Sequence, residues 1–420
     1  MKITILTYGS RGDIQPFLPL SLSLMSRGHI VKLAAPSRFQ NLVEEYGVQF
    51  IPIAGEPEDL SRRFNDAGRN PLRMISEMMN YAIGIGADVL RQTDEACRDT
   101  DLIIHTFLHA VGAHTLAREK KIPDIHIQTF PMFVPTGDYP NVTLPDLKFA
   151  PLNRMTHILS NEMTWWGSRL GFEQVRRRAG FPKRKLYWPF DEDEDPSRPR
   201  TPVLCAWSPS ILPPSRDWPP HTYVTGWYFL SKDSRYTPPP NLQAFLEAGE
   251  APICISFGST VNRNVKEIDR IVRDALSQTG NRGIILSGWG QLVNSSSEKI
   301  LYLEATPHDW LLPQCKLIIH HGGAGTTSAG LQAGIPNIVV PFAVDQPFWG
   351  RRVHAVGAGP VPIPVKKLSI EKLTQAILKA ESKAYHHLAA LIGRKIRSED
   401  GVGAAVRLIE EHANDFQKRS

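Results

Sequence analysis

Polar and flexible residues gather at three places in this 420-residue chain, each directly after a short apolar run. The first is Gly9–Asp13, the second is His321–Ser328 and the third is Pro341–Pro347. Short apolar runs of this kind are typical of buried strands, and ligands bind at the loops that follow such strands. We therefore expect the chemistry of the protein in these three segments.

The second segment has the composition of a diphosphate site. Its glycines let a ligand approach the backbone, and a helix that begins there presents unpaired N–H groups with about half a positive charge. The residues expected to bind the diphosphate are His321, Gly323, Ala324, Gly325, Thr326 and Thr327. Ser259 and Thr260, in a similar turn after the run 253–257, add hydroxyl donors. Tight packing of a strand-to-helix turn is the alternative explanation.

Asp345 and Gln346 in the third segment place an acid and an amide side by side. Sugar hydroxyls need both a hydrogen-bond acceptor and a donor, which this pair supplies. A helix cap is the alternative. Because the pair follows the next apolar run after the glycine-rich segment, we favour sugar binding.

The elements that position these segments alternate between short apolar runs and helical patterns. The chain is longer than one hydrophobic core usually supports, and such alternation is typical of parallel sheets with crossover helices. The predicted fold class is therefore α/β, with two Rossmann-like doubly wound parallel-sheet domains facing each other across a cleft. The apolar runs are 3–7, 30–34, 102–105, 125–129, 253–257, 283–286, 300–303, 317–320 and 338–341.

The predicted domain boundaries follow a change of composition. Residues 176–219 are rich in charge runs and prolines, as a linker is. We expect an N-terminal domain over 1–217 and a C-terminal domain over 218–400. A C-terminal helix over 401–420 is expected to return to the N-terminal domain.

Composition excludes several classes of protein. The net charge of +6 is mild, and no basic stripe interleaved with aromatic residues indicates nucleic acid. The four cysteines are scattered, without the spacing of a zinc knuckle or a disulfide framework. No run of about 18 apolar residues predicts a membrane span. We expect a cytoplasmic monomer or dimer, and a peripheral contact with a membrane stays open.

The second and third segments together resemble a known family. His321-Gly322-Gly323 with Asp345-Gln346 is similar to the donor signature of the inverting, nucleotide-sugar-dependent glycosyltransferases of family 1. The stretch 307–350 is most similar to the sterol and lipid 3-beta-glucosyltransferase branch, and Gly9–Pro16 resembles both this branch and the glycosyltransferases of glycopeptide antibiotics. The resemblance covers essentially the full chain, with 55–100 and 135–200 matching least. It implies a GT-B type fold and a UDP-sugar-dependent, inverting hexosyltransferase that requires neither metal nor cofactor.

The resemblance also implies the catalytic residues. Asp13 matches the position of the catalytic histidine of the plant small-molecule enzymes, so we predict that it is the general base for the acceptor hydroxyl. A helix cap is the alternative role for Asp13. His105 occupies what resembles the position of the helper aspartate of those enzymes. An Asp13–His105 dyad is a hypothesis, and a hydrogen-bonded histidine at a strand end is its alternative.

The remaining site residues are assigned by position. Ser10, Arg11 and Gly12 are expected beside the donor, and Trp289 is the candidate for stacking on the base, because Ala305 stands where the plant enzymes carry a stacking tryptophan. UDP-glucose is the expected donor, with dTDP sugars open. The acceptor is expected to be a sterol-like lipid or another hydrophobic natural product with a hydroxyl. Its apolar pocket is expected to include Phe107, His109, Phe130, Met132 and Phe133.

Three other functions remain open. Gly323-Ala324-Gly325, with Asp345 further along, imitates the fingerprint of a dinucleotide oxidoreductase, although Ser328 stands at its third glycine position. A nucleotide-sugar epimerase has the same architecture. An inactive nucleotide-sugar-binding module is the alternative outside the enzymes.

Overall fold

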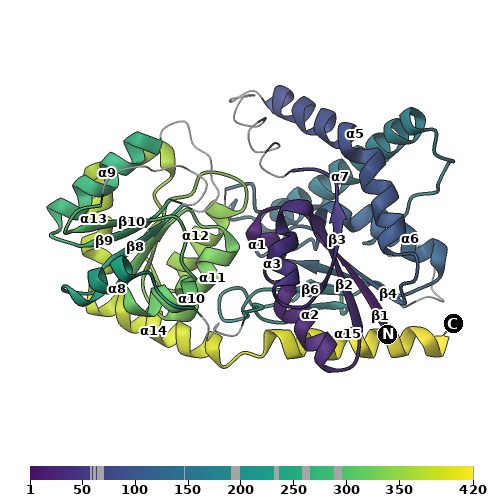
Figure 1. Cartoon of the computed structure of the whole chain (residues 1–420). Coiled ribbons are helices and arrows are strands. Elements are labelled where there is room, and N and C mark those ends of the chain that lie inside the picture. The colour runs from purple at the N-terminus through teal and green to yellow at the C-terminus, as the bar shows by residue number, and fades with distance from the viewer. Residues whose placement is uncertain are drawn as a thin grey trace. The chain divides into compact units, whose positions relative to one another are not determined.

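A computed structural model describes the chain except residues 57, 58, 60–62, 64–70, 146, 191–198, 231–235, 258–264, 288–295 and 420, and the side chains of 71–75, 78 and 79. Contacts divide the chain into two compact units (Figure 1). The first unit consists of Met1–Pro209, Pro213–Leu230 and Asp400–Ser420. The second consists of Ser210–Leu212 and Ser231–Glu399.

The first unit is built on a seven-stranded parallel sheet in the order β3-β2-β1-β4-β5-β6-β7. Its central strands are buried, as in a parallel sheet covered by helices on both faces. The strands are β1 (Lys2–Leu6), β2 (Ile30–Pro36), β3 (Gln49–Ile53), β4 (Leu102–His105), β5 (Asp124–Gln128), β6 (Val203–Cys205) and β7 (Thr222–Val224). The helices are α1 (Arg11–Ile14), α2 (Phe17–Ser26), η1 (Ser37–Phe39), α3 (Gln40–Glu44), α5 (Pro71–Ala96), η2 (Phe107–His109), α6 (Ala110–Lys120), α7 (Ala150–Ala179) and α15 (Gly401–Arg419).

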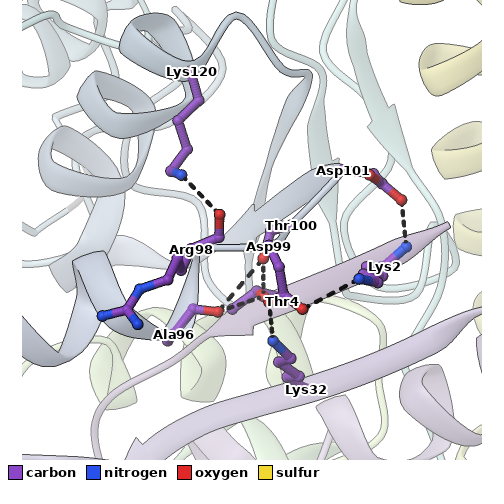
Figure 2. A network of polar contacts seen from close by, with 9 residues as sticks. All are labelled: Lys2, Thr4, Lys32, Ala96, Arg98, Asp99, Thr100, Asp101 and Lys120. Carbon is purple, nitrogen blue, oxygen red and sulfur yellow. Dashed lines mark hydrogen bonds and ion pairs between the residues drawn. The ribbon is translucent and has the colours of Figure 1, made fainter.

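A polar network fixes the segment that leads into β4 against the amino ends of β1 and β2 (Figure 2). The backbone N–H of Lys2 donates to Asp101 Oδ2 at 2.7 Å. The carboxylate of Asp99 accepts from the ammonium groups of Lys2 and Lys32. These hydrogen bonds lower the pKa of Asp99 to about 2. The network therefore secures the pairing of β1 with β4, whose opposite ends form the site described below.

The last helix of the chain, α15, packs beside α2 in the first unit (Figure 1). Its buried residues Val406 and Ile409 join the core that lies against β1 and β2. Glu410 of α15 accepts hydrogen bonds from Arg27 at 2.7 Å and from His29 at 3.0 Å. The C-terminal segment is thus part of the first unit.

The second unit has a five-stranded parallel sheet in the order β10-β9-β8-β11-β12. One apolar core joins α9 and α13 to one face of this sheet, and a second core joins α8, α10 and α11 to the other. The strands are β8 (Ile253–Ser256), β9 (Gly283–Leu286), β10 (Ile300–Leu303), β11 (Leu317–His320) and β12 (Asn337–Val339). The helices are α8 (Pro240–Glu247), α9 (Val265–Gln278), α10 (His308–Leu311), η4 (Leu312–Gln314), α11 (Ala324–Ala333), α12 (Gln346–Ala355), η5 (Val365–Lys367), α13 (Ile370–Ala380) and α14 (Lys383–Arg397).

The predicted fold class is confirmed, since both units are α/β with parallel sheets. The assignment of 176–219 to a linker is wrong in part. The first residues of this segment complete α7, and the segment also contains β6, which pairs with β5. Because β7 also pairs with β6, the first unit continues to Leu230, beyond the expected boundary at 217. Strands of three residues are too short to produce a periodic pattern, which is why the sequence did not indicate them.

The packing of α15 predicts a loss of stability when its core face is truncated. Ile409→Ala should lower the free energy of unfolding by about 2–5 kcal/mol, because Ile409 is fully buried and its removal leaves a cavity. The control is Leu378→Ala on α13, where the side chain is 56% exposed and the change should stay within about 0.5 kcal/mol. Urea denaturation measures both. Equal effects of the two substitutions would contradict the docking of α15 in the first core.

Candidate active site

A pocket lies at the carboxyl ends of β1, β4 and β5 in the first unit. Leu6 pairs with His105, and His105 with His126, so the three strands end at the same level and their loops leave from one edge. The pocket brings the predicted base together with most of the predicted acceptor residues. Its lining residues are Thr7, Tyr8, Asp13, Phe17, Thr106, Phe107, Ile127, Gln128, Thr129, Phe130, Met132 and Phe133.

Asp13 is held in the short helix α1 by a reciprocal cap. Ser10 precedes the helix, and Asp13 Oδ2 accepts from the Ser10 backbone N–H at 2.8 Å and from Ser10 Oγ at 3.0 Å. Asp13 therefore reaches back from the third helical position instead of standing at the N-cap itself. Its other oxygen, Oδ1, has no hydrogen bond with any residue that the structure describes. Oδ2 thus fixes the orientation of the carboxylate, and Asp13 lines the pocket.

Gly9 allows this close approach of the carboxylate. Its φ of 144° lies in a region that favours glycine, and a Cβ atom at this position would overlap Asp13 Oδ2. The hydroxyl of Thr7 donates to the Asp13 carbonyl at 2.7 Å and closes the loop. Burial raises the pKa of Asp13, although its hydrogen bonds with Ser10 act in the opposite direction.

His105 does not partner Asp13. Its Nε2 lies 2.9 Å from Asp124 Oδ2 and its Nδ1 lies 3.2 Å from His126 Nδ1, so both ring nitrogens are occupied. His114 Nδ1 also lies 2.9 Å from Asp124 Oδ2. Burial alone would raise the pKa of Asp124, but the two histidines beside it lower this pKa below its ordinary value. The hypothesis of an Asp13–His105 dyad is therefore wrong, and the hydrogen-bonded strand-end histidine is the structure observed.

His109 is also not part of the pocket lining. The turn η2 directs its ring inward, where it is buried and packs edge-on against Tyr8, with ring centroids 6.5 Å apart. Phe107 of the same turn faces the pocket, and its ring lies 5.4 Å from that of Phe133 and 6.3 Å from that of Phe130. The phenylalanines of the predicted acceptor set are therefore gathered in one place. His109 packs against Tyr8, which is itself a lining residue of the pocket.

Gln128 is a pocket residue that the sequence analysis missed. It is buried at the end of β5, where its Oε1 accepts from the backbone N–H groups of Met132 and Phe133, each at 3.4 Å. It thereby shapes the turn that carries Phe130 and Phe133. A polar residue at the end of a buried strand was the signal that could have revealed it.

The glycine-rich turn of the second unit lies against the acid–amide pair. Gly322 has a φ of 93°, and a Cβ atom there would lie 3.0 Å from the Gln346 carbonyl oxygen. His320, fully buried, bonds Asn337 Oδ1 through Nε2 at 3.0 Å and accepts from the Gly322 N–H through Nδ1 at 3.1 Å. The ends of β11 and β12 thus bring together two of the segments in which we expected chemistry.

Asp345 and Gln346 begin α12 and shape the turn before it. Gln346 Oε1 accepts from the N–H groups of Phe342 at 2.8 Å and Ala343 at 3.2 Å. Asp345 Oδ2 accepts from Trp349 Nε1 at 3.0 Å. Val344, directly before Asp345, has a φ of 57°, which is unfavourable for a β-branched residue and marks a turn held in place by its surroundings. Asp345 stands at the N-cap position of α12, but its side chain makes no capping hydrogen bond.

The start of α11 presents the groups expected around a diphosphate. Gly323 is the N-cap, Gly325 is exposed and Thr326 is half-buried. The ring of His321 lies over the turn, since its Nε2 would be only 2.5 Å from a Cβ atom on Gly323. Thr327 differs from the expectation: it is fully buried on the inner side of the helix, so its hydroxyl does not reach the surface of the turn.

The remaining predicted donor residues divide into two groups. Ser10 caps α1 as described, Gly12 is exposed, and Arg11 is exposed with its Nε donating to Gln15 Oε1 at 2.9 Å. Ser259, Thr260 and Trp289 lie outside the described residues.

The described residues provide neither a metal-binding cluster nor a membrane-spanning helix. Among them, no group of three or more His, Cys, Asp or Glu side chains is arranged to hold a metal ion. None of the described helices is both long enough and apolar enough to cross a membrane.

Two family models match the chain. Residues 3–114 match the glycosyltransferase family 28 N-terminal domain. Residues 284–400 match the C-terminal domain described as erythromycin biosynthesis protein CIII-like. The matches cover the segment of Asp13 and the segments of His321 and Asp345.

Curated relatives match almost the whole chain. The sterol 3-beta-glucosyltransferases UGT80A2 and UGT80B1 of Arabidopsis thaliana are 35% and 34% identical to it, and each match covers 98% of the chain. The chain spans 66% and 68% of the lengths of these two proteins. The sterol 3-beta-glucosyltransferase of Yarrowia lipolytica is 33% identical over 97% of the chain, which spans 28% of that longer protein.

Solved structures share the fold. The glycosyltransferase of kitacinnamycin superposes with a TM-score of 0.70 at 19% identity, over 98% of each chain. The calicheamicin glycosyltransferase CalG4 superposes with a TM-score of 0.66 at 16% identity, again over 98% of each chain. The predicted GT-B type fold is confirmed by these neighbours.

The buried histidines predict a pH dependence of stability. Burial lowers the pKa of His109 and of His321 to about 4 and that of His320 to about 3. In the unfolded chain these groups titrate near about 6.5, so between about pH 6.5 and 4 the unfolded chain binds more protons than the folded one. The free energy of unfolding should therefore fall as the pH falls through this window, as urea denaturation at several pH values will measure.

Carboxylates titrate in part of the same window, so variants isolate the contribution of a histidine. His109→Phe should make this decrease shallower, whereas His387→Gln on exposed α14 surface should leave it unchanged. An identical pH dependence in His109→Phe and the parent protein would contradict the neutral, buried state of His109.

Proposed function

We propose, since this chain belongs to the family of the sterol 3-beta-glucosyltransferases, that it transfers a hexose from a UDP-sugar to the hydroxyl of a sterol-like acceptor. The observation that supports this most directly is the pocket of the first unit, where Asp13 shares one cavity with aromatic side chains. Membership of this family offers no support to the dinucleotide oxidoreductase or the epimerase. UDP-glucose is the donor we propose.

The pocket supports an apolar acceptor that carries a hydroxyl. Phe107, Phe130, Met132 and Phe133 offer rings and a flexible thioether to a flat hydrocarbon skeleton. Asp13 lies in the lining of the same pocket. An acceptor bound with its hydroxyl toward Asp13 would bury its apolar body against the rings and place its reacting oxygen beside the carboxylate.

Asp13 is the proposed general base. The acceptor hydroxyl must lose its proton as its oxygen attacks the anomeric carbon, and a single displacement inverts that centre. Oδ2 is held by Ser10, so Oδ1 is the atom we assign to take the proton. Burial raises the pKa of Asp13 and so makes it a stronger base than an exposed aspartate.

The start of α11 is the proposed diphosphate site. Its first N–H groups have no partner within the helix, so they are the donors we propose for the diphosphate. Burial lowers the pKa of His321 to about 4, so this imidazole is neutral at pH 7, and its Nδ1 donates to the Ser256 carbonyl at 3.5 Å. Asp345 and Gln346 are the proposed partners of the sugar hydroxyls.

Replacing the base tests the proposed function directly. The protein should transfer glucose from UDP-glucose to a sterol, as measured by mass spectrometry of the product, with macrolide and flavonoid acceptors and dTDP-glucose tested alongside. Asp13→Asn keeps an oxygen that can accept from Ser10 but removes the basic carboxylate. It should lower kcat by about 10²–10⁴-fold while UDP binding, measured by calorimetry, is unchanged.

Two glycine-to-alanine substitutions provide a matched comparison. Gly9→Ala should also reduce kcat, because its Cβ would displace the Asp13 carboxylate. Gly47→Ala has a similar cost of backbone strain at a φ of 71° but meets open space, so transfer should be retained. Undiminished transfer by Asp13→Asn would disprove the assignment of the base, and donor binding with no transfer to any acceptor would favour the inactive binding module.

Independence from metal is a further part of the proposal. If the backbone N–H groups at the start of α11 stabilise the leaving diphosphate, transfer should be the same after dialysis against EDTA as before it. The initial rate with and without added Mg²⁺ or Mn²⁺ measures this. Activity that is lost in EDTA and restored by Mn²⁺ would contradict it.

A further inference from the structure

The outward face of α7 carries a stripe of exposed, large apolar side chains. They recur every three or four residues, so they lie along one side of the helix over about 27 Å at 1.5 Å per residue. Met163 is 71% exposed and Trp166 is 58% exposed. The stripe consists of Leu152, Met155, Leu159, Met163, Trp166 and Leu170.

The inward face of α7 is polar in the first half of the helix, whereas Val175 near its end is a buried apolar residue. Three polar side chains on this face bond carbonyl oxygens of the segment 132–139. Asn153 Nδ2 donates to Gly137 at 3.0 Å, His157 Nε2 lies 3.0 Å from the Tyr139 oxygen, and Asn161 Nδ2 donates to Phe133 at 2.8 Å. A surface helix in water normally has the opposite arrangement, with apolar residues inside and polar residues outside. The arrangement of α7 suits a helix whose outer side meets an apolar medium.

The charge of α7 is positive around this stripe. Five arginines and two glutamates give the helix a net charge of +3. Glu173 is neutralised by Arg176 at 2.6 Å and Arg177 at 2.8 Å, and Arg178 is exposed at the end of the helix. The guanidinium of Arg169 lies 5.5 Å from the ring centroid of Trp166. An apolar stripe with tryptophan and a basic rim is typical of helices that lie in the interface of an anionic bilayer.

We propose that α7 docks the protein on the surface of an anionic lipid bilayer, with the stripe in the acyl boundary and the arginines among the headgroups. The charge favours this occupant over a second copy of the chain. A two-fold contact between copies would place two such helices, each with a net charge of +3, against each other.

The docking surface is linked to the acceptor pocket. Asn161 holds the carbonyl of Phe133, whose ring lines the pocket beside Asp13. Docking of α7 therefore holds a wall of the pocket close to the bilayer, the phase in which an apolar acceptor resides. This link rests on the proposed function, whereas the docking itself does not.

Vesicle binding tests the proposal with the full chain. Co-sedimentation is measured with vesicles of phosphatidylcholine alone and of phosphatidylcholine with phosphatidylserine, without donor or acceptor. The combined variant Leu159→Gln, Met163→Gln and Trp166→Gln should bind the anionic vesicles at least about tenfold more weakly than the parent chain, because it removes the apolar contact. The control is Val361→Gln with Leu378→Gln, two apolar residues of the second unit that are 63% and 56% exposed, and it should bind as the parent does.

The outcomes separate the alternatives. Strong binding to anionic vesicles that weakens with salt and is lost in the α7 variant supports the proposal. Equal binding of the α7 variant and the parent, or no binding by the parent, overturns it, and equal binding to both lipid mixtures overturns its electrostatic part. A parent dimer in sedimentation velocity that the variant abolishes, without vesicle binding, assigns the face to a second copy instead. Melting by circular dichroism confirms that the variants fold, and transfer to a detergent-dispersed sterol tests the proposed function separately.

Discussion

Parallel pairing of the strands is the constraint on which both candidate sites depend. In the first unit the register of β1, β4 and β5 brings their carboxyl ends to one edge, so the loops that carry Asp13, Phe107 and Phe133 share one pocket. In the second unit the pairing of β11 with β12 places the glycine-rich turn against Gln346. An antiparallel neighbour would send each following loop to the opposite edge, and neither group of residues would assemble.

At both edges the backbone must come close to a functional group, and glycine makes that possible. Gly9 and Gly322 adopt positive φ, and at each a Cβ atom would crowd a functional group, the Asp13 carboxylate in one case and the Gln346 carbonyl in the other. Glycine therefore contributes to the sites because it has no Cβ atom. Val344 also adopts a positive φ although it is not a glycine, so its turn is strained.

Histidine has two different uses in this fold. His105 stabilises the buried Asp124, whose isolated charge would otherwise be costly in the core. It is therefore unavailable to Asp13, whose environment is set by burial and by Ser10. His321 is kept neutral by burial at the edge of the glycine turn, where its Nδ1 lies 3.5 Å from the Ser256 carbonyl oxygen. Residue type alone does not distinguish these uses, because the partner decides them.

The sequence by itself determined the α/β class, nearly all the strands that carry site loops, and the segments of Asp13, His321 and Asp345. These signals are local: an apolar run followed by glycine and polar residues is visible within about ten positions. Only the tertiary structure decided which way side chains point. It turned His105 toward Asp124, buried Thr327, and left the apolar face of α7 outside, because each direction is set by partners distant in the chain. The three-residue strands β6 and β7 likewise exist only through their pairing with β5 and with each other.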